Sequence, residues 1–167
     1  MSEEEAIFKS KIKSTGIFSF KDFYKFCHDW LVSETNLHVA EGKYTEKLSG
    51  DTKDVEVEWE GRRDVTDYFR FKVNVKFVIL KLSEVEISQN GVKEKTNKGS
   101  VEVEVKGILV RDYKGKFERT SIQKFLRSIY EKWIISARVK QLEDKLVEDL
   151  DEFLAQAKAF LDLEGKK

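Results

Sequence analysis

The chain has 167 residues, with 31 basic and 31 acidic side chains and therefore a formal net charge of zero. This length suits one compact domain over residues 1-167, and the charge balance argues against a surface devoted to nucleic-acid phosphates. Charged residues make up 37% of the chain, which predicts a densely charged surface around an apolar core. One cysteine and two histidines are too few for an internal disulfide or a zinc cluster, so we expect no metal and no cofactor.

Neither the N-terminal residues nor the composition point to a secreted or membrane protein. The first residues are acidic where a signal peptide is basic, and no apolar run reaches the roughly 18 residues of a membrane span. The chain has no proline, and it has no internal repeat or low-complexity linker that would mark a second domain. We therefore expect a cytoplasmic protein without a membrane span.

The first two segments predict a strand and a helix. In residues 3-14, apolar or small residues alternate with lysines, which favours an edge strand over a helix. Ser19 is then a suitable N-cap, and apolar residues spaced by three and four predict a helix over Phe20 to Val32 with an aromatic buried face. Cys27 belongs to that face and His28 is turned about 100° from it, which indicates a structural thiol and not a catalytic pair.

The central part of the chain predicts antiparallel strands. A strand over residues 42-48 and a turn at 49-51 lead into two strands, 55-60 and 69-77, in which apolar residues alternate with charged ones. We expect Glu58 opposite Arg70 and Trp59 opposite Phe69, because this register places opposite charges on one face and large apolar groups on the other.

The next hairpin carries the candidate interaction site. The apolar positions change phase after Leu82 and again at Gly107, a natural bulge residue, so we expect Leu80 opposite Ile108 with a loop over 89-99 and apolar cover on both faces near Leu80. The same register sets glutamates against glutamates, and such a face needs water, nearby lysines, a cation or a basic partner. The four facing carboxylates are Glu84, Glu86, Glu102 and Glu104.

The C-terminal third predicts helix. Apolar stripes over 122-134 and over 139-161 point in different directions on one continuous helix, so we expect a kink or break near 136-138, the alternative being one helix of about 40 residues. Residues 139-163 form a terminal amphipathic helix that packs on the sheet or on a partner. The seven-residue spacing from Val139 to Phe160 is interrupted by Asp149 and Gln156, which favours the sheet over a dimer seam.

Together these elements predict an α+β fold. We expect an antiparallel β-meander of four or five strands, with one N-terminal helix and a long, kinked C-terminal helical segment on one face. The sequence contains no glycine-rich phosphate loop, nucleophile elbow or paired histidines, and we recognise no family motif in it. We therefore expect a small non-enzymatic binding or adaptor domain that contacts a protein partner, or a second copy of itself, through the 82-105 hairpin or the C-terminal helix.

Two alternatives remain open. A pocket protein of the helix-grip type would bind an apolar small molecule or lipid between the sheet and the C-terminal helix, by analogy of fold alone. Its pocket would be lined by Trp59, Phe69, Phe71 and Trp133. Single-stranded nucleic acid could bind the basic face near Arg70, Lys72 and Lys76, but the facing glutamates argue against this alternative.

Overall fold

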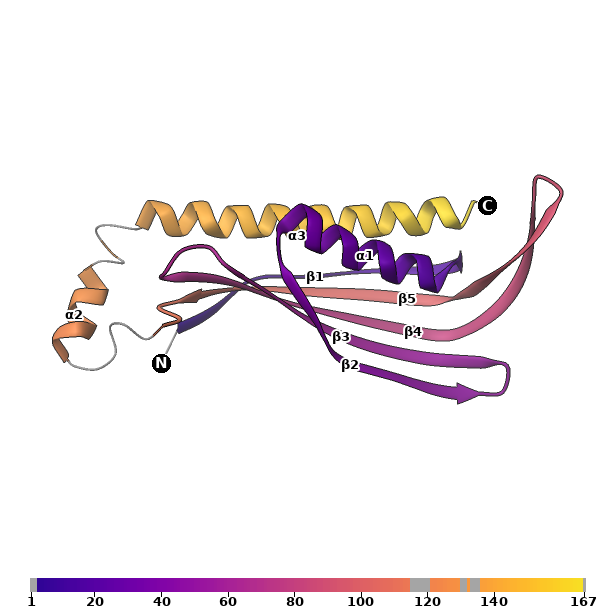
Figure 1. Cartoon of the computed structure of the whole chain (residues 1–167), viewed down its shortest axis with the longest axis horizontal. Coiled ribbons are helices and arrows are strands. Elements are labelled where there is room, and N and C mark those ends of the chain that lie inside the picture. Colours follow the sequence, from indigo (N-terminus) through magenta and orange to yellow (C-terminus); the bar gives the residue numbers. More distant parts are fainter. Residues whose placement is uncertain (1–2, 115–120, 130–131, 133–135, 167) are drawn as a thin grey trace.

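The computed structural model describes residues 3–114, 121–129, 132 and 136–166 (Figure 1). Its five strands form one antiparallel sheet in the order β1-β5-β4-β3-β2, so the predicted α+β architecture is confirmed and the N-terminal segment is the fifth strand. The strands are β1 (Glu3–Phe18), β2 (His38–Ser49), β3 (Thr52–Asp64), β4 (Phe69–Gln89) and β5 (Val92–Arg111). The helices are α1 (Phe20–Thr35), α2 (Ser121–Ile129) and α3 (Ser136–Glu164).

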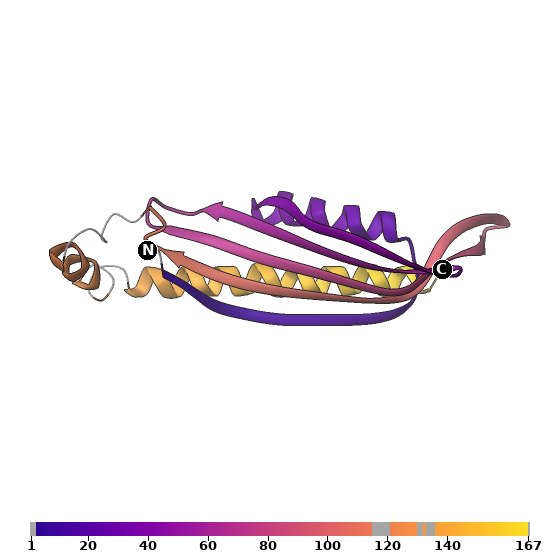
Figure 2. The same cartoon turned by 90° about the horizontal axis from the view of Figure 1, so that it is seen from below.

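Helices α1 and α3 cover one face of the sheet (Figures 1 and 2). Alternate residues of β3, β4 and β5 point toward them, and the core is strongly aromatic where the helices meet the sheet. The Phe23 ring of α1 lies 6.1 Å from that of Phe77 on β4 and 5.7 Å from that of Phe160 on α3. The sheet and the two helices therefore share one hydrophobic core.

Helix α1 begins where the sequence predicts it. The Oγ of Ser19 accepts a hydrogen bond from the Asp22 amide at 3.3 Å, and the Phe20 amide donates to Oδ1 of Asn97 on β5 at 3.0 Å. These bonds satisfy amides that the helix itself leaves without a partner. Asn97 thus ties the start of α1 to the sheet.

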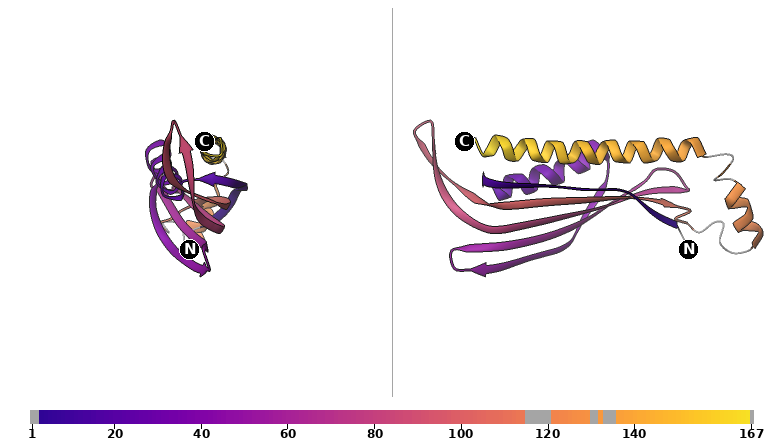
Figure 3. Two further views of the ribbon diagram at one scale, coloured as in Figure 1. Left: turned by 90° about the vertical axis from the view of Figure 1, so that its right-hand side faces the viewer. Right: turned by 180° about the vertical axis from the view of Figure 1, so that it is seen from behind.

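The C-terminal segment contains separate helices. Helix α2 ends at Ile129 and α3 begins at Ser136, and the two run in different directions (Figure 3), which agrees with the predicted break and not with one straight helix. The apolar stripe of α3 is buried against the sheet and α1. Its buried members are Leu142, Leu146, Leu150, Phe153, Leu154, Ala157 and Leu161.

The register of β3 against β4 differs from the prediction. Glu58 lies opposite Lys76 and Trp59 opposite Val75, so the expected pairs with Arg70 and Phe69 are wrong. The turn lies later than expected, because the Oγ1 of Thr66 accepts hydrogen bonds from the amides of residues 68 and 69. A shift by an even number of residues preserves the alternation of faces and charges, which is why the sequence pattern allowed both registers.

The register of β4 against β5 also differs. The strands meet in a tight turn at Asn90 and Gly91, with φ of 52° and 78°, and not in a loop over 89-99. Asn-Gly is the pair that a type I′ hairpin turn favours, because both of its positions need positive φ. Leu80 consequently lies opposite Ser100 and not Ile108.

The bulge in this strand pair lies at Lys81 and Leu82, not at Gly107. This bulge inserts one extra residue into β4, so the buried side chains of β4 pass from odd positions before it to an even position at Leu82. The change in the alternation of apolar residues that the sequence predicts at this point is therefore present. The expected apolar cover on both faces at this level is wrong, since Leu80 is 44% exposed. Gly107 instead lies where α3 packs closely on the sheet, next to Leu150.

Candidate functional site

The far end of the β4-β5 hairpin extends beyond the other strands. Pairing of β3 with β4 ends at Leu82, and pairing of β1 with β5 ends at Asn97. Residues 83–96, here called the distal arm, therefore form a two-stranded ribbon whose outer edges pair with no other strand among the described residues. Figure 1 shows the arm bending out of the plane of the sheet past the turn between β2 and β3.

The two faces of the distal arm differ in chemistry. Glu86 lies opposite Lys95 on one face. Val85 lies opposite Thr96 on the other, next to Ile87, and both apolar side chains are half-buried. A two-stranded ribbon without its own core is marginally stable in water, so its length is not explained by the stability of the domain.

The structure separates the four predicted partner-binding carboxylates. Glu84 and Glu86 lie on the distal arm opposite Asn97 and Lys95, whereas Glu102 and Glu104 lie within the sheet. None of these four carboxylates lies opposite another one, as the predicted register required. The carboxylates within the sheet also have cationic neighbours on β1: Lys9 Nζ lies 3.4 Å from Glu104, and Lys11 Nζ lies 3.6 Å from Glu102.

The outer face of the sheet is balanced in charge from edge to edge. One row of directly opposed residues alternates in sign across all five strands: Lys11, Glu104, Lys76, Glu58 and Lys43. Such cross-strand pairs each contribute roughly 0.2–1 kcal/mol. The basic residues that could bind single-stranded nucleic acid each form an ion pair with a carboxylate. The pairs are Arg70 with Asp64, Lys72 with Glu4 and Lys76 with Glu56.

A small open cavity, here called the edge notch, lies between α1 and the edge of the sheet at β2 and β3. It has a volume of about 320 Å³. The Tyr24 hydroxyl accepts a hydrogen bond from Nε1 of Trp59 at 3.2 Å and donates one to the Glu41 carboxylate at 2.9 Å. Burial raises the pKa of Tyr24 above its usual value. The lining residues are Tyr24, Lys25, His28, Asp29, Glu41 and Trp59.

Sequence reasoning did not find the edge notch, because its residues come from three separate segments. One signal was present: Gly42 interrupts the β2 pattern, and an isolated glycine in a strand often marks a bulge. The structure has a bulge there, since Glu41 lies opposite Trp59 while Lys43 lies opposite Glu58.

Three of the four residues predicted to line an apolar pocket lie in the described part of the chain. Trp59, Phe69 and Phe71 are buried in the core, with Trp59 only 3% exposed. Trp59 lines the edge notch, and neither Phe69 nor Phe71 does. Trp133 lies outside the described residues.

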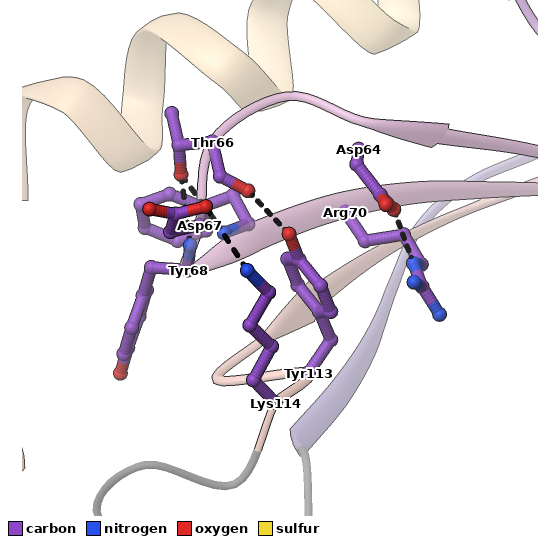
Figure 4. Close-up of polar contacts among 8 residues, drawn as sticks. Asp64, Thr66, Asp67, Tyr68, Arg70, Tyr113 and Lys114 are labelled. Carbon is purple, nitrogen blue, oxygen red and sulfur yellow. Dashed lines mark hydrogen bonds and ion pairs between the residues drawn. The ribbon is translucent and has the colours of Figure 1, made fainter.

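At the end opposite the distal arm, a polar cluster joins the β3-β4 turn to the end of β5 (Figure 4). The Tyr113 hydroxyl donates to the Thr66 carbonyl at 2.8 Å, and Lys114 lies 3.1 Å from the Asp67 carboxylate. The Arg70 guanidinium lies 4.4 Å from the centre of the Tyr113 ring. These contacts hold the residues that follow β5 against the β3-β4 turn at the corner of the sheet.

Helix α2 presents an apolar face to solvent. Ile122 is 72% exposed and Phe125 is 65% exposed, and Leu126 and Ile129 lie on the same exposed side. Arg127, in contrast, is buried and lies 3.1 Å from the Glu3 carboxylate of β1.

Several kinds of site are missing from the described part of the chain. No three His, Cys, Asp or Glu side chains converge there as metal ligands. Cys27 is fully buried, and burial raises the pKa of its thiol, as expected for a structural cysteine. None of the helices described has the length and apolar character needed to cross a membrane.

Comparison of the chain with protein-family models, curated proteins and solved structures gives no match.

Proposed function

We propose that this chain is a non-enzymatic binding domain that docks a partner protein through its distal arm. The observation that supports this proposal is the pair of strand edges on residues 83–96, which pair with no other strand in the described part of the molecule. An open edge offers unpaired backbone donors and acceptors to an extended segment of another chain, and strand addition is a common mode of recognition.

The distal arm is a better candidate than the C-terminal helix. The apolar stripe of α3 is buried against its own sheet and α1, so it offers little to a partner. One face of the arm carries Val85 and Ile87, with Glu94 opposite Ile87, and the other face carries the opposed charges of Glu86 and Lys95. An added strand would gain backbone hydrogen bonds from the edge, and Val85 and Ile87 would contact its alternate side chains.

A shortened arm tests the proposal. Deletion of residues 85–88 together with 93–96 removes four directly opposed pairs and keeps the Asn90-Gly91 turn. It removes an even number of residues from each strand, so the faces of the remaining ribbon stay in phase. Asn97, which caps α1, is retained. We therefore expect this variant to fold with an unchanged core.

The measurement is crosslinking in cells followed by binding assays with the purified partner. We expect partners of the parent chain to bind the shortened variant at least about tenfold more weakly, a loss of about 1.4 kcal/mol. A Phe125→Ser variant at the opposite end serves as the control and should bind normally. Equal affinity of all three proteins would refute the proposal. Light scattering would identify a second copy as the partner if the parent chain dimerises and the shortened chain does not.

The alternative, a pocket for an apolar ligand or lipid, is less well supported. Phe69 and Phe71, two of its expected lining residues, pack in the core. Native mass spectrometry tests it directly: a co-purified apolar molecule that is lost in Trp59→Ala would favour the pocket, and a chain without any bound molecule would refute it.

A further inference from the structure

Helix α2 is amphipathic, but its apolar face points away from the domain. The residues of this face are spaced by three and four along the helix, and all of them are exposed. They are Ile122, Phe125, Leu126 and Ile129. A helix on the surface of a globular domain ordinarily turns such a face toward the core, so α2 has the opposite orientation.

Arg127 holds the polar side of α2 against the sheet. Its side chain is buried, and its guanidinium lies 3.1 Å from the Glu3 carboxylate of β1 and 3.8 Å from the carboxylate of Asp112, which follows β5. Around the helix axis, Arg127 lies on average about 140° from the four apolar residues. Ion pairs at this position therefore turn the apolar face outward. The exposure of that face is a consequence of specific contacts of the folded chain.

The surroundings of α2 are basic, although the chain as a whole has no net charge. Helix α2 contains no acidic residue, and residues 114–140 contain eight basic side chains and only two acidic ones. Lys124 of α2 is exposed, and so are Arg138 and Lys140 at the end of α3 that lies nearer to α2 (Figure 1). A second copy of the chain on this face would bring like charges together, which argues against a dimer here.

We propose that α2 binds the surface of an anionic lipid bilayer, with its apolar face among the acyl chains and the basic side chains near the lipid phosphates. A bilayer offers both chemistries in one surface, because an apolar layer lies directly beneath a layer of negative charge. The nine residues of α2 span about 14 Å, so the helix would lie in the plane of the surface.

The position of α2 permits this contact. The helix lies beyond the end of the sheet, opposite the distal arm and outside the stack formed by the sheet, α1 and α3 (Figure 3). A flat surface can therefore approach its apolar face. This proposal goes beyond the docking of a partner protein, since it concerns the other end of the molecule.

The test is co-sedimentation of the full chain with vesicles of phosphatidylcholine, and with vesicles of an equal mixture of phosphatidylcholine and phosphatidylglycerol. We expect at least about tenfold stronger partitioning to the anionic vesicles, because basic side chains near the surface are attracted to it. An increase in salt from about 0.1 M to about 1 M should weaken this binding, since the Debye length falls from about 10 Å to about 3 Å. Absence of sedimentation, or equal partitioning to both kinds of vesicle, would overturn the proposal.

Matched variants assign the binding to the apolar face. Ile122→Ser combined with Phe125→Ser removes the two most exposed members of this face and should lower partitioning at least about tenfold. Leu163→Ser changes a similarly exposed side chain on α3 and should leave partitioning unchanged. Full partitioning of the double variant would overturn the proposal. A parent chain that dimerises in light scattering, while the double variant does not, would also overturn it and identify a second copy as the occupant.

Charge reversal provides an independent test that leaves α2 intact. Arg138→Glu combined with Lys140→Glu should weaken binding to the anionic vesicles at least about tenfold. Lys21→Glu combined with Lys25→Glu makes the same change in net charge on the exposed side of α1 and should have little effect. Equal loss in both charge variants would overturn the assignment to this end of the molecule. The shortened-arm variant should sediment like the parent chain, so the two proposals can fail separately.

Discussion

Gly107 of β5 lies directly beneath Leu150 of α3: a Cβ atom at residue 107 would lie only 2.7 Å from Cδ1 of Leu150. The same Cβ would lie 3.3 Å from Cβ of Phe8 on β1 and 3.4 Å from Cδ2 of Leu146. All three neighbours belong to the core or pack against it. The helix can approach the sheet this closely only because residue 107 has no side chain.

We predict that Gly107→Ala lowers the free energy of unfolding by about 1–3 kcal/mol, because an added methyl group has no room in a filled core. Leu150→Val removes atoms at the point of contact. In the double variant, part of the loss due to Gly107→Ala should therefore be recovered, which appears as a coupling energy in a urea-unfolding cycle. Strictly additive losses would contradict the close approach.

The turn of the distal arm provides a second prediction. Gly91 has φ of 78°, so Gly91→Val should cost roughly 1–2 kcal/mol locally. Because residues 83–96 lie outside the core, we expect faster hydrogen exchange at arm amides and little change at residues 101–105, which lie in the middle of the sheet. Asn90→Gly, which tolerates the same conformation, is the control and should leave the exchange of the arm amides as it is in the parent chain. Faster exchange throughout the sheet would contradict the independence of the arm.

The acid stability of the corner depends on Asp64. A hydrogen bond from Arg70 holds the pKa of this carboxyl below its usual value, and Coulomb attraction to Arg70 adds to the effect (Figure 4). A pKa that is lower in the folded state contributes stability above the unfolded value of about 4, and this stability is lost as the pH falls through the folded value. Asp64→Asn should therefore reduce stability at pH 7, by less than about 1 kcal/mol because the pair is exposed.

Chemical denaturation of both proteins at several pH values between about 3 and 7 measures this effect. The difference between Asp64→Asn and the parent chain should shrink toward the acid end. A difference that stays constant with pH would contradict a lowered pKa of Asp64 in the folded protein.

Cys27 should be unreactive in the folded protein. Its side chain is fully buried and burial raises the pKa of the thiol, so the reactive thiolate is scarce. We predict that a disulfide reagent at pH 8 labels Cys27 only as fast as the chain opens, and at full speed in denaturant. Rapid labelling under native conditions would contradict the packing of α1 on the sheet.

The exposed apolar face of α2 predicts unequal costs for matched truncations. Leu126→Ala should change the free energy of unfolding by no more than about 0.5 kcal/mol, because the Leu126 side chain is half exposed and not part of the core. Leu146→Ala, on the buried face of α3, should cost about 2–5 kcal/mol. Thermal or urea unfolding measures both. A large loss in Leu126→Ala would show that α2 packs on another part of the molecule.

Much of this fold could be predicted from the sequence because local patterns report local structure. The alternation of residues in 3-14 indicated an edge strand, and Ser19 marked the start of α1. The stripe from Val139 to Leu161 defined the buried face of α3, which the structure confirms. The Asn90-Gly91 pair also marked the hairpin turn, a signal that the predicted loop over 89-99 overlooked.

The sequence by itself determined the type and order of the main strands and helices, and the apolar side of β3 and of α3. Only the tertiary structure decided the registers, because a shift by two residues leaves every side chain on the same face. It thereby separated Glu84 from Glu104 and set Glu104 beside Lys9. The edge notch also depends on the tertiary structure. Tyr24 contacts Glu41 and Trp59 only because α1 lies against the edge of the sheet, and no local periodicity of the sequence predicts that placement.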